Sequence, residues 1–217
     1  MDKTVNNFWK IRMARLKEAL EENNFGVYLA ENLREAADLT QTKILPELNA
    51  KSLSWGGSMT FKGSGLYERL RDSSQYEILD TYDRSVSPEV TLERRRQALL
   101  SDVFFTGTNA VTESGQLVNL DMIGNRVGAI VFGPKHVVVL AGRNKIVGDI
   151  HEAMVRVKDF SSPANVMRLG KNTPCAKTSV CQECKSPDRI CNVWTITEKS
   201  YPKKRIRIVL INEDLGL

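Results

Sequence analysis

Short apolar segments alternate with amphipathic segments along most of this chain, and this alternation constrains its fold more than any other feature. Apolar residues at helical spacing indicate helices, whereas short continuous apolar runs suit buried strands. The pattern predicts helices at residues 8–22, 32–48, 60–70, 88–100 and 144–158. It predicts strands at residues 25–30, 53–55, 77–80, 102–107, 116–120, 126–132, 136–140, 193–197 and 205–211.

Strands that alternate with helices favour an α/β fold, here a Rossmann-like mixed sheet with helices on both faces. Only Gly133-Pro134-Lys135 separates the predicted strands 126–132 and 136–140, so we expect an antiparallel flank in the middle of the chain. No repeat or low-complexity linker divides the sequence. We therefore predict one domain over residues 1–217, with an irregular insertion at about 160–192.

The four cysteines of the chain all lie in this insertion, with the spacing C-x5-C-x2-C-x6-C. Thiolate sulfurs suit zinc or an iron–sulfur cluster. A structural zinc site usually has two close pairs of ligands, and this spacing contains only one. Two interpretations remain: a metal centre, or reduced thiols around a loop. The predicted ligands are Cys175, Cys181, Cys184 and Cys191.

Composition limits the classes of partner. The chain has 217 residues, 41% of them hydrophobic, and a net charge of +5, which together suit a globular domain that accepts an anionic ligand. The positive charge is spread along the chain, so we expect no nucleic-acid partner. No apolar run spans a membrane, and no signal-peptide core follows the N-terminus. We expect a cytoplasmic protein without disulfides, and a symmetric homodimer as the default assembly.

A glycine turn follows the predicted strand 53–55 and precedes a helix. Two glycines let the backbone turn closely, and free N–H groups at a helix start can hold an anion. The alternative interpretation is an ordinary strand-to-helix turn with a hydroxyl as its N-cap. The candidate ligand-binding residues of this turn are Gly56, Gly57, Ser58 and Thr60.

A polar segment of small residues follows the predicted strand 102–107. Strand ends are where α/β sheets place ligands, and small residues leave room for one. Glu113 is the single carboxylate of this segment and can serve as nucleophile or general base. The alternative is a polar hairpin with a solvated glutamate. The other candidates here are Thr106, Gly107, Thr108, Asn109 and Gly115.

Three further groups of candidates follow in the chain. Asn119 and Asp121 share one face if the strand continues, and Asn125 and Arg126 come just after them. Arg126 can pair with the carboxylate or phosphate of a ligand, or with a neighbouring acidic residue. Lys145 stands at a predicted strand-to-helix junction, where it reaches an anionic ligand or lies exposed in the first turn. We expect the glycine turn and the segment before Leu117 to converge on one pocket at the sheet rim.

Three stretches of the sequence resemble the LUD domain of lactate-utilisation proteins. The most specific is residues 106–147, which begin TGTNAVTESGQLVNLDMIGNR, and SWGGSMT at residues 54–60 fits the same family. Residues 173–192 look like a cysteine-bearing branch of it. The resemblance implies a fold similar to that of sugar-phosphate isomerases and coenzyme A transferases. It also implies a role in oxidising lactate to pyruvate, beside iron–sulfur partner proteins.

The resemblance to the wider superfamily implies transferase or isomerase chemistry as an alternative role. Residues 57–60 are similar to loops that hold sugar phosphates, and residues 112–115 to the loop that carries the glutamate nucleophile of coenzyme A transferases. The isomerases have an aspartate where this chain has Asn109, and an amide is no general base. The first alternative to a lactate role is therefore a transferase or isomerase that uses Glu113. The second is a non-catalytic ligand-binding or regulatory subunit, because the chain has only two histidines and no placed base–nucleophile pair. Without a nicotinamide or flavin fingerprint, redox power would come from a metal centre or from partners.

Overall fold

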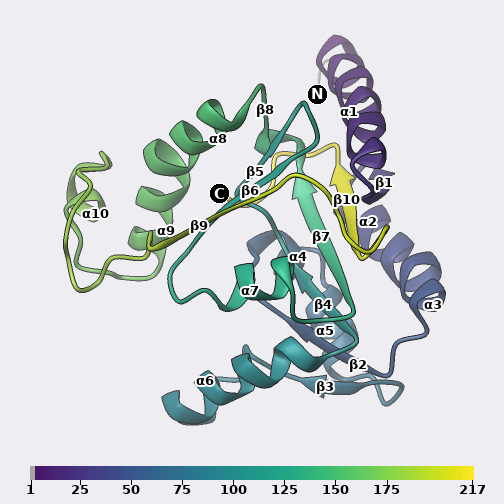
Figure 1. Ribbon diagram of the computed structural model, residues 1–217, viewed down its shortest axis with the longest axis horizontal. Helices are drawn as coiled ribbons and strands as arrows, with labels where there is room; N and C mark the ends of the chain where they lie inside the picture. Colours follow the sequence, from purple (N-terminus) through teal and green to yellow (C-terminus); the bar gives the residue numbers. More distant parts are fainter. Residues whose placement is uncertain (1–2) are drawn as a thin grey trace.

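The computed structural model describes residues 3–217, and its main element is a sheet of six parallel strands (Figure 1). The strands stand in the order β1-β10-β7-β4-β2-β3, so the chain crosses over repeatedly and brings the last strand next to the first. Buried parallel strands read as continuous apolar runs, which is why the sequence predicted them. Their bounds are β1 (Gly26–Ala30), β2 (Ser52–Trp55), β3 (Glu77–Leu79), β4 (Val103–Thr106), β7 (His136–Gly142) and β10 (Ile206–Ile211).

A second, smaller sheet of four strands has the order β8-β5-β6-β9. β5 pairs antiparallel with β6, and β6 with β9, whereas β5 and β8 run parallel. This sheet supplies the antiparallel part of the α/β fold and carries the polar segment that follows β4. Its strands are β5 (Ala110–Thr112), β6 (Leu117–Asp121), β8 (Ile146–Val147) and β9 (Val193–Thr197).

Helices cover both faces of the six-stranded sheet, and alternate strand residues point to opposite faces. Val138 and Leu140 of β7 pack on one face against the first group of helices, α2 (Leu33–Leu39), α3 (Leu45–Leu48), α4 (Met59–Gly63) and α5 (Leu66–Arg71). Val137 and Val139 pack on the other face against α1 (Lys3–Glu22), α7 (Asn125–Val131) and residues of the small sheet. Both layers therefore bury apolar surface, at about 25 cal/mol for each Å² removed from water.

The remaining helical segments connect these layers or stand outside them. A π-helical turn (Thr40–Ile44) joins α2 to α3, and 3-10 turns lie at Ala98–Leu100 and Arg143–Lys145. α6 (Pro88–Gln97) begins at the predicted proline, with Ser87 as its N-cap. Asn32 caps α2 as predicted and accepts a hydrogen bond from the Glu35 N–H. The last group is α8 (Ile150–Arg156), a π-helical turn (Val157–Ser161), α9 (Ser162–Arg168) and α10 (Pro174–Thr178).

The predicted strand at 126–132 is wrong, because residues 126–131 lie in helix α7 (Asn125–Val131). A short apolar run suits either a strand or a buried helix, and here the buried positions Val127, Ala129 and Ile130 face the core while Phe132 is 85% exposed. The expected antiparallel flank at Gly133-Pro134-Lys135 is therefore also wrong. β7 pairs parallel with β4 and β10, and the antiparallel hairpin is formed by β5 and β6 instead.

The predicted helix at 144–158 is correct only in its second half. The Ile146–Val147 pair forms β8 beside β5, and Asp149 then caps α8 by accepting from the Glu152 N–H. The insertion also contains more structure than expected, because it includes α9 and α10. These helices and the loop after them project from the left of Figure 1.

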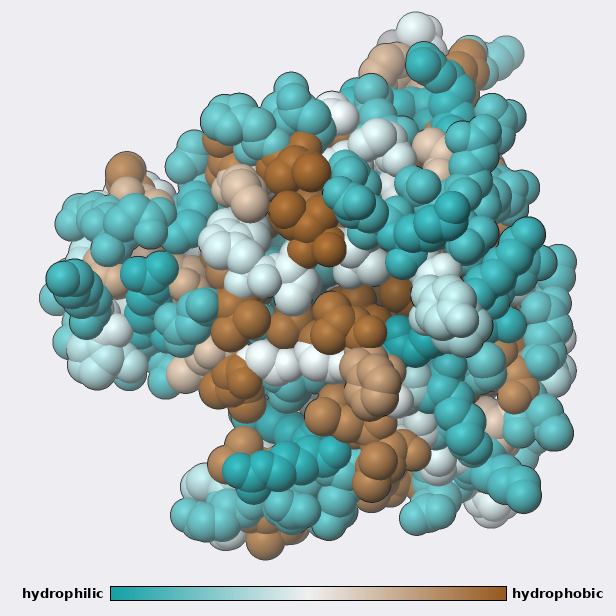
Figure 2. All heavy atoms as spheres, in the orientation of Figure 1, coloured by the Kyte–Doolittle hydropathy of each residue, from teal (hydrophilic) through white to brown (hydrophobic). Residues whose placement is uncertain are grey.

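On the molecular surface, apolar residues form an exposed band over β9 and α7 (Figure 2).

Candidate functional site

The glycine turn after β2 and the polar segment after β4 lie side by side. β2 and β4 are neighbouring parallel strands, so their carboxyl ends meet at one rim of the sheet. A Cβ placed on Gly107 would lie only 2.8 Å from Ser58 Oγ, which shows how closely the two segments approach. Ser58 Oγ is the N-cap of α4 and accepts from the Phe61 N–H at 3.1 Å. The two loops therefore converge at one rim of the sheet, as we expected, and a common pocket between them stays a prediction.

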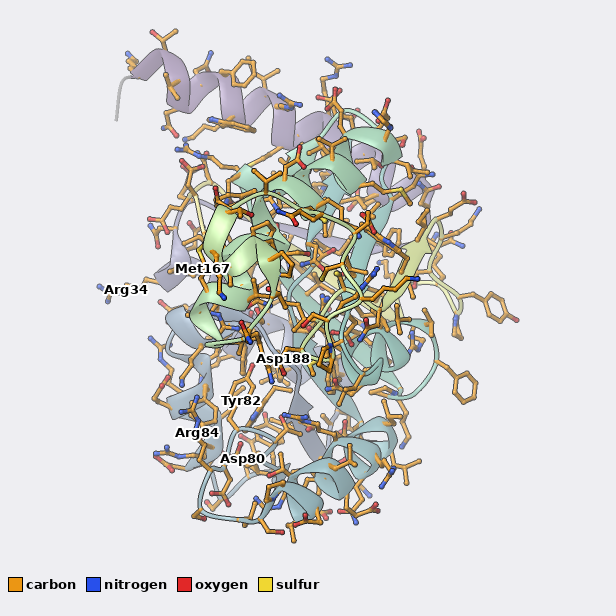
Figure 3. The ribbon with its side chains drawn as sticks, turned by 90° about the vertical axis from the view of Figure 1, so that its left-hand side faces the viewer. Arg34, Asp80, Tyr82, Arg84, Met167 and Asp188 are labelled. Carbon is orange, nitrogen blue, oxygen red and sulfur yellow. The ribbon has the colours of Figure 1, made fainter. Side chains whose placement is uncertain are left out.

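The glycine turn is held in place by the segment that follows β3. The hydroxyl of Tyr82 donates to the Gly56 carbonyl at 2.5 Å and accepts from the Ser58 N–H at 3.1 Å. Thr81 Oγ1 donates to the Trp55 carbonyl at 2.6 Å. Figure 3 shows Tyr82 beside Asp80 on this segment. Burial raises the pKa of Tyr82 to about 12, so its hydroxyl stays protonated and remains a donor.

Lys145 is buried at the same rim. Its side chain is brought there by the 3-10 turn after β7, and its Nζ donates to the Thr108 carbonyl at 3.0 Å. Burial, together with the positive charges of Arg156 and Arg126, lowers the pKa of Lys145 to about 7. The predicted alternative of an exposed first-turn lysine is therefore wrong, since only 6% of Lys145 is exposed.

Thr60 is a second buried polar residue at the rim, beside Lys145. Thr60 is only 2% exposed, and its Oγ1 has no hydrogen-bond partner in the described chain. A Cβ placed on Gly216 would lie 3.1 Å from this Oγ1 and 3.5 Å from Lys145 Nζ. A buried hydroxyl without a partner is rare and calls for an acceptor. The two donors therefore face one small region beside the Gly216 backbone.

The C-terminal tail is anchored over this region by polar contacts. Arg143 Nε lies 2.9 Å from Asp214 Oδ1, and the Leu215 N–H donates to Asn144 Oδ1 at 3.0 Å. Arg143 is almost fully buried, whereas most of the Asp214 side chain is exposed. The guanidinium lowers the pKa of the Asp214 carboxyl, so the pair stays charged at neutral pH. No sequence pattern predicts this contact, because it depends on long-range packing.

Arg126 holds the polar segment together. Its two terminal nitrogens donate to the side-chain oxygens of Asn119 and Asn109 at 2.7 and 2.8 Å. They also donate to the Gly107 and Leu120 carbonyls, and Nε lies 3.5 Å from Asp121 Oδ1. All the guanidinium nitrogens therefore have partners inside the protein, and Arg126 braces the rim. Arg126 therefore pairs with the neighbouring Asp121, which was one of the two interpretations. A ligand-binding role for Arg126 stays a prediction.

The remaining predicted ligand-binding residues lie at or near this rim, except Gly115. The Thr106 and Thr108 hydroxyls donate to the Gly107 and Ala110 carbonyls, so both are used within the protein. Gly57 has open space around it, because a Cβ placed there would meet nothing within 4 Å. Asn125 is the first residue of α7. Gly115 packs against α1 instead, where a Cβ would come within 2.8 Å of the Ala19 backbone.

Glu113 lies at the far end of the β5–β6 hairpin, against α1. Its Oε1 lies 2.8 Å from Arg12 Nε, and half of its side chain is exposed. The hairpin carries it away from Lys145, which stands beside Thr108 at the opposite end of β5. A catalytic role for Glu113 stays a prediction.

The cysteine loop does not fit a metal centre as it is folded. All four thiols are free and partly buried, and no group of three or more His, Cys, Asp or Glu side chains in residues 3–217 is arranged to hold a metal ion. Arg189 instead organises the loop by donating to the Cys184 and Cys191 carbonyls at 2.8 and 2.9 Å. Metal binding stays a prediction carried by the spacing, and elemental analysis of protein purified without oxygen tests it.

The fold defines an α/β protein whose candidate site lies at the carboxyl rim of a parallel sheet. It is similar to the crystal structure of a DUF162 family protein from Deinococcus radiodurans, with a TM-score of 0.51 and 13% sequence identity over 94% of this chain and 98% of that one. The family model of the LUD domain matches residues 13–211, so the chain belongs to the LUD domain family. A search of curated proteins gives no significant match. No helix in the described part of the chain is long and apolar enough to cross a membrane.

Proposed function

We propose that this protein binds a small organic anion at Thr60 and Lys145. The observation that carries the proposal is that two buried polar groups face the same small region, and that Thr60 Oγ1 has no partner there. A carboxylate or phosphate oxygen accepts hydrogen bonds from both a hydroxyl and an ammonium group. The low dielectric of the buried rim strengthens such a contact relative to water.

Membership of the LUD domain family favours one ligand class. In lactate utilisation the anion is a short 2-hydroxy or 2-oxo carboxylate, lactate or pyruvate. On this proposal the protein holds the carboxylate at Thr60 and Lys145 in the cytoplasm, and iron–sulfur partner proteins carry the electrons. Lys145 has a pKa of about 7, so it both neutralises an anion and exchanges a proton near neutral pH.

The test is ligand-induced stabilisation, because a ligand that binds only the folded state raises its stability. Melting curves in lactate, pyruvate and inorganic phosphate, each matched in ionic strength with chloride, separate a carboxylate from a phosphate ligand. We expect stabilisation of the parent protein that disappears in both Thr60→Val and Lys145→Met. Lys135→Met is the matched control, because the Lys135 side chain is 75% exposed and pairs with Asp102. Equal stabilisation of the parent and both variants would contradict the proposal.

A further inference from the structure

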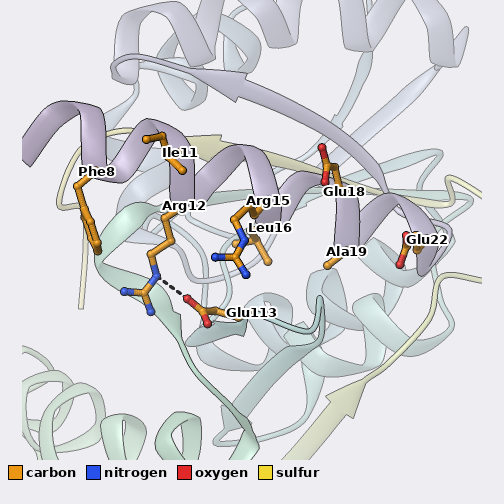
Figure 4. Close-up of a pocket in the computed structure, with 9 residues that line it drawn as sticks. All are labelled: Phe8, Ile11, Arg12, Arg15, Leu16, Glu18, Ala19, Glu22 and Glu113. Carbon is orange, nitrogen blue, oxygen red and sulfur yellow. Dashed lines mark ion pairs between the residues drawn. The ribbon is translucent and has the colours of Figure 1, made fainter.

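One face of helix α1 has no partner in the described chain. Phe8 and Ile11 on this face are 53% and 57% exposed, although α1 is 20 residues long and buries Met13, Leu16 and Leu20 on its other side. Figure 4 looks onto this face, which borders a groove of about 460 Å³ between α1 and Glu113. An apolar and charged helix face beside a groove is a surface that suits another helix.

The spacing on this face is that of a helix packed against a second helix. The sequence positions 8, 11, 15, 18 and 22 advance by alternate steps of three and four residues. Such steps keep side chains in one line along a helix and define the contact line of paired helices. Phe8 and Ile11 form the apolar end of the line, and Arg15, Glu18 and Glu22 form the charged end.

The charges of α1 are arranged against its own dipole. Every charged residue from Lys3 to Lys17 is basic and every later one in the helix is acidic, so neither the first turn nor the last carries the favourable sign. A helix dipole favours acids at the N-terminus and bases at the C-terminus. The arrangement therefore costs the isolated helix stability, and a partner of the opposite polarity compensates for it.

The neighbouring elements account for only part of these charges. Lys10, Arg12 and Lys17 pair with Glu31, Glu113 and Glu21. The three charged residues in the contact line, by contrast, make no ion pair with any residue in the range 3–217. They are Arg15, Glu18 and Glu22.

We propose that a second copy of this chain covers this face, with the two α1 helices packed antiparallel. An antiparallel copy sets the basic half of one helix against the acidic half of the other, whereas a parallel copy would set like charges together. In the register of the contact line, Arg15 of each copy faces Glu18 of the other, twice across a two-fold axis. The same register sets Ile11 opposite Glu22, the last residue of the partner's α1, so only Phe8 extends past the end of the partner helix.

Two helices alone bury less surface than a standard interface of roughly 800 Å² per partner. The proposed dimer is therefore weak and reversible, and its charge pairs make it sensitive to salt. Sedimentation equilibrium of the full chain over micromolar to millimolar concentrations measures its dissociation constant. We expect a monomer–dimer equilibrium that shifts toward monomer as salt rises.

Charge-reversal variants test whether Arg15 of one copy faces Glu18 of the other. Arg15→Glu and Glu18→Arg each set like charges opposite each other, so we expect each to raise the dissociation constant roughly tenfold or more. The double variant R15E/E18R restores the opposite charges, and we expect it to recover the parent value to within about threefold. The control is Arg34→Glu on α2, where the side chain is 89% exposed. We expect this variant to associate as the parent does. Circular dichroism checks that each variant keeps its helices.

Three results would overturn the proposal. They are a parent protein that stays monomeric throughout the range, single reversals that associate as the parent does, or a double variant no better than the singles. None of these results bears on the anion site, which lies at the sheet rim and not on this face of α1.

Discussion

Thr60 and Lys145 come from opposite halves of the chain, yet both reach the backbone of Gly216: a Cβ there would lie 3.1 Å from Thr60 Oγ1 and 3.5 Å from Lys145 Nζ. Thr60 is placed by the helix that follows β2, and Lys145 by the turn that follows β7. The hydroxyl has no partner, and the ammonium has the Thr108 carbonyl. This relationship sets the first two predictions.

Lys145 makes the stability of the protein depend on pH. Its pKa of about 7 lies below the ordinary 10.5, so between these values the unfolded chain holds a proton that the folded protein has lost. Stability therefore rises with pH in this window, by up to about 1.4 kcal/mol per pH unit. Urea unfolding from pH 6 to 10 measures it. We expect the free energy of unfolding of the parent protein to rise more steeply with pH than that of Lys145→Met. The same pH dependence in both proteins would contradict the assigned pKa.

Binding of a carboxylate should have the opposite pH dependence. Lactate and pyruvate keep their charge above pH 5, whereas Lys145 loses its own as pH rises through about 7. We expect their affinity to fall by up to tenfold per pH unit above that value, because only the ammonium form attracts the anion. Titration calorimetry at pH 6, 7 and 8 measures the change. Lys135→Met, which alters an exposed lysine, should keep the parent profile.

Gly56 and Gly57 offer a matched pair of substitutions in one turn. A Cβ on Gly56 would come within 2.8 Å of the Phe104 ring, whereas a Cβ on Gly57 would meet nothing within 4 Å. We expect Gly56→Ala to lower the free energy of unfolding by about 1–3 kcal/mol through overpacking. Gly57→Ala should leave it within about 1 kcal/mol of the parent. Urea unfolding followed by tryptophan fluorescence compares them, and equal effects would mean that the turn packs differently.

Replacement of Arg126 should destabilise the protein more than any other change considered above. Arg126→Met removes the guanidinium that donates to the Asn109 and Asn119 oxygens and to two carbonyls and that pairs with Asp121, at a cost of about 3–5 kcal/mol. Arg126→Lys should recover little of this, because an ammonium cannot reproduce the planar fork of a guanidinium. Chemical denaturation measures both variants. A lysine variant as stable as the parent would show that charge alone suffices at this position.

Glu113→Gln should have a small effect on stability. The carboxylate is half exposed and its pair with Arg12 lies at the surface, so the loss is at most about 1 kcal/mol. We also expect carboxylate affinity to stay unchanged, because the Glu113 end of the hairpin is remote from Lys145. Calorimetry and urea unfolding measure the two quantities. A large loss of affinity would instead place Glu113 in the ligand site.

The sequence was most informative where residues are buried on both sides. β7 and β10 are continuous apolar runs between two helical layers, so their composition alone predicts strands. α7 was misassigned because its short apolar run suits either a strand or a helix, and Gly128 in its middle favours neither. β5 and β8 have three and two residues, too few to establish a period, so their pairing is visible only in three dimensions.

The candidate site was predictable only in part, for a similar reason. Strand ends located Ser58 and Gly107 at one rim, because parallel neighbours terminate together. Tyr82 and Gly216 were not predicted, since each reaches the rim only through contacts distant in sequence. Arg126 pairs with the neighbouring Asp121, which was one of its two interpretations, but its other acceptors come from several separate segments. No spacing rule could indicate that its donors are already used.

The anchored tail has a kinetic consequence. Thr60 and Lys145 are 2% and 6% exposed, and the Gly216 backbone lies against both. We therefore expect a molecule from solvent to reach them when residues 214–216 swing aside, which separates the Asp214–Arg143 pair. Binding then has two steps. The tail opens at a rate that is independent of ligand concentration, and the ligand then binds quickly. Stopped-flow rates that level off at high concentration, and that climb when Asp214 becomes asparagine, are the expected signature of this gate.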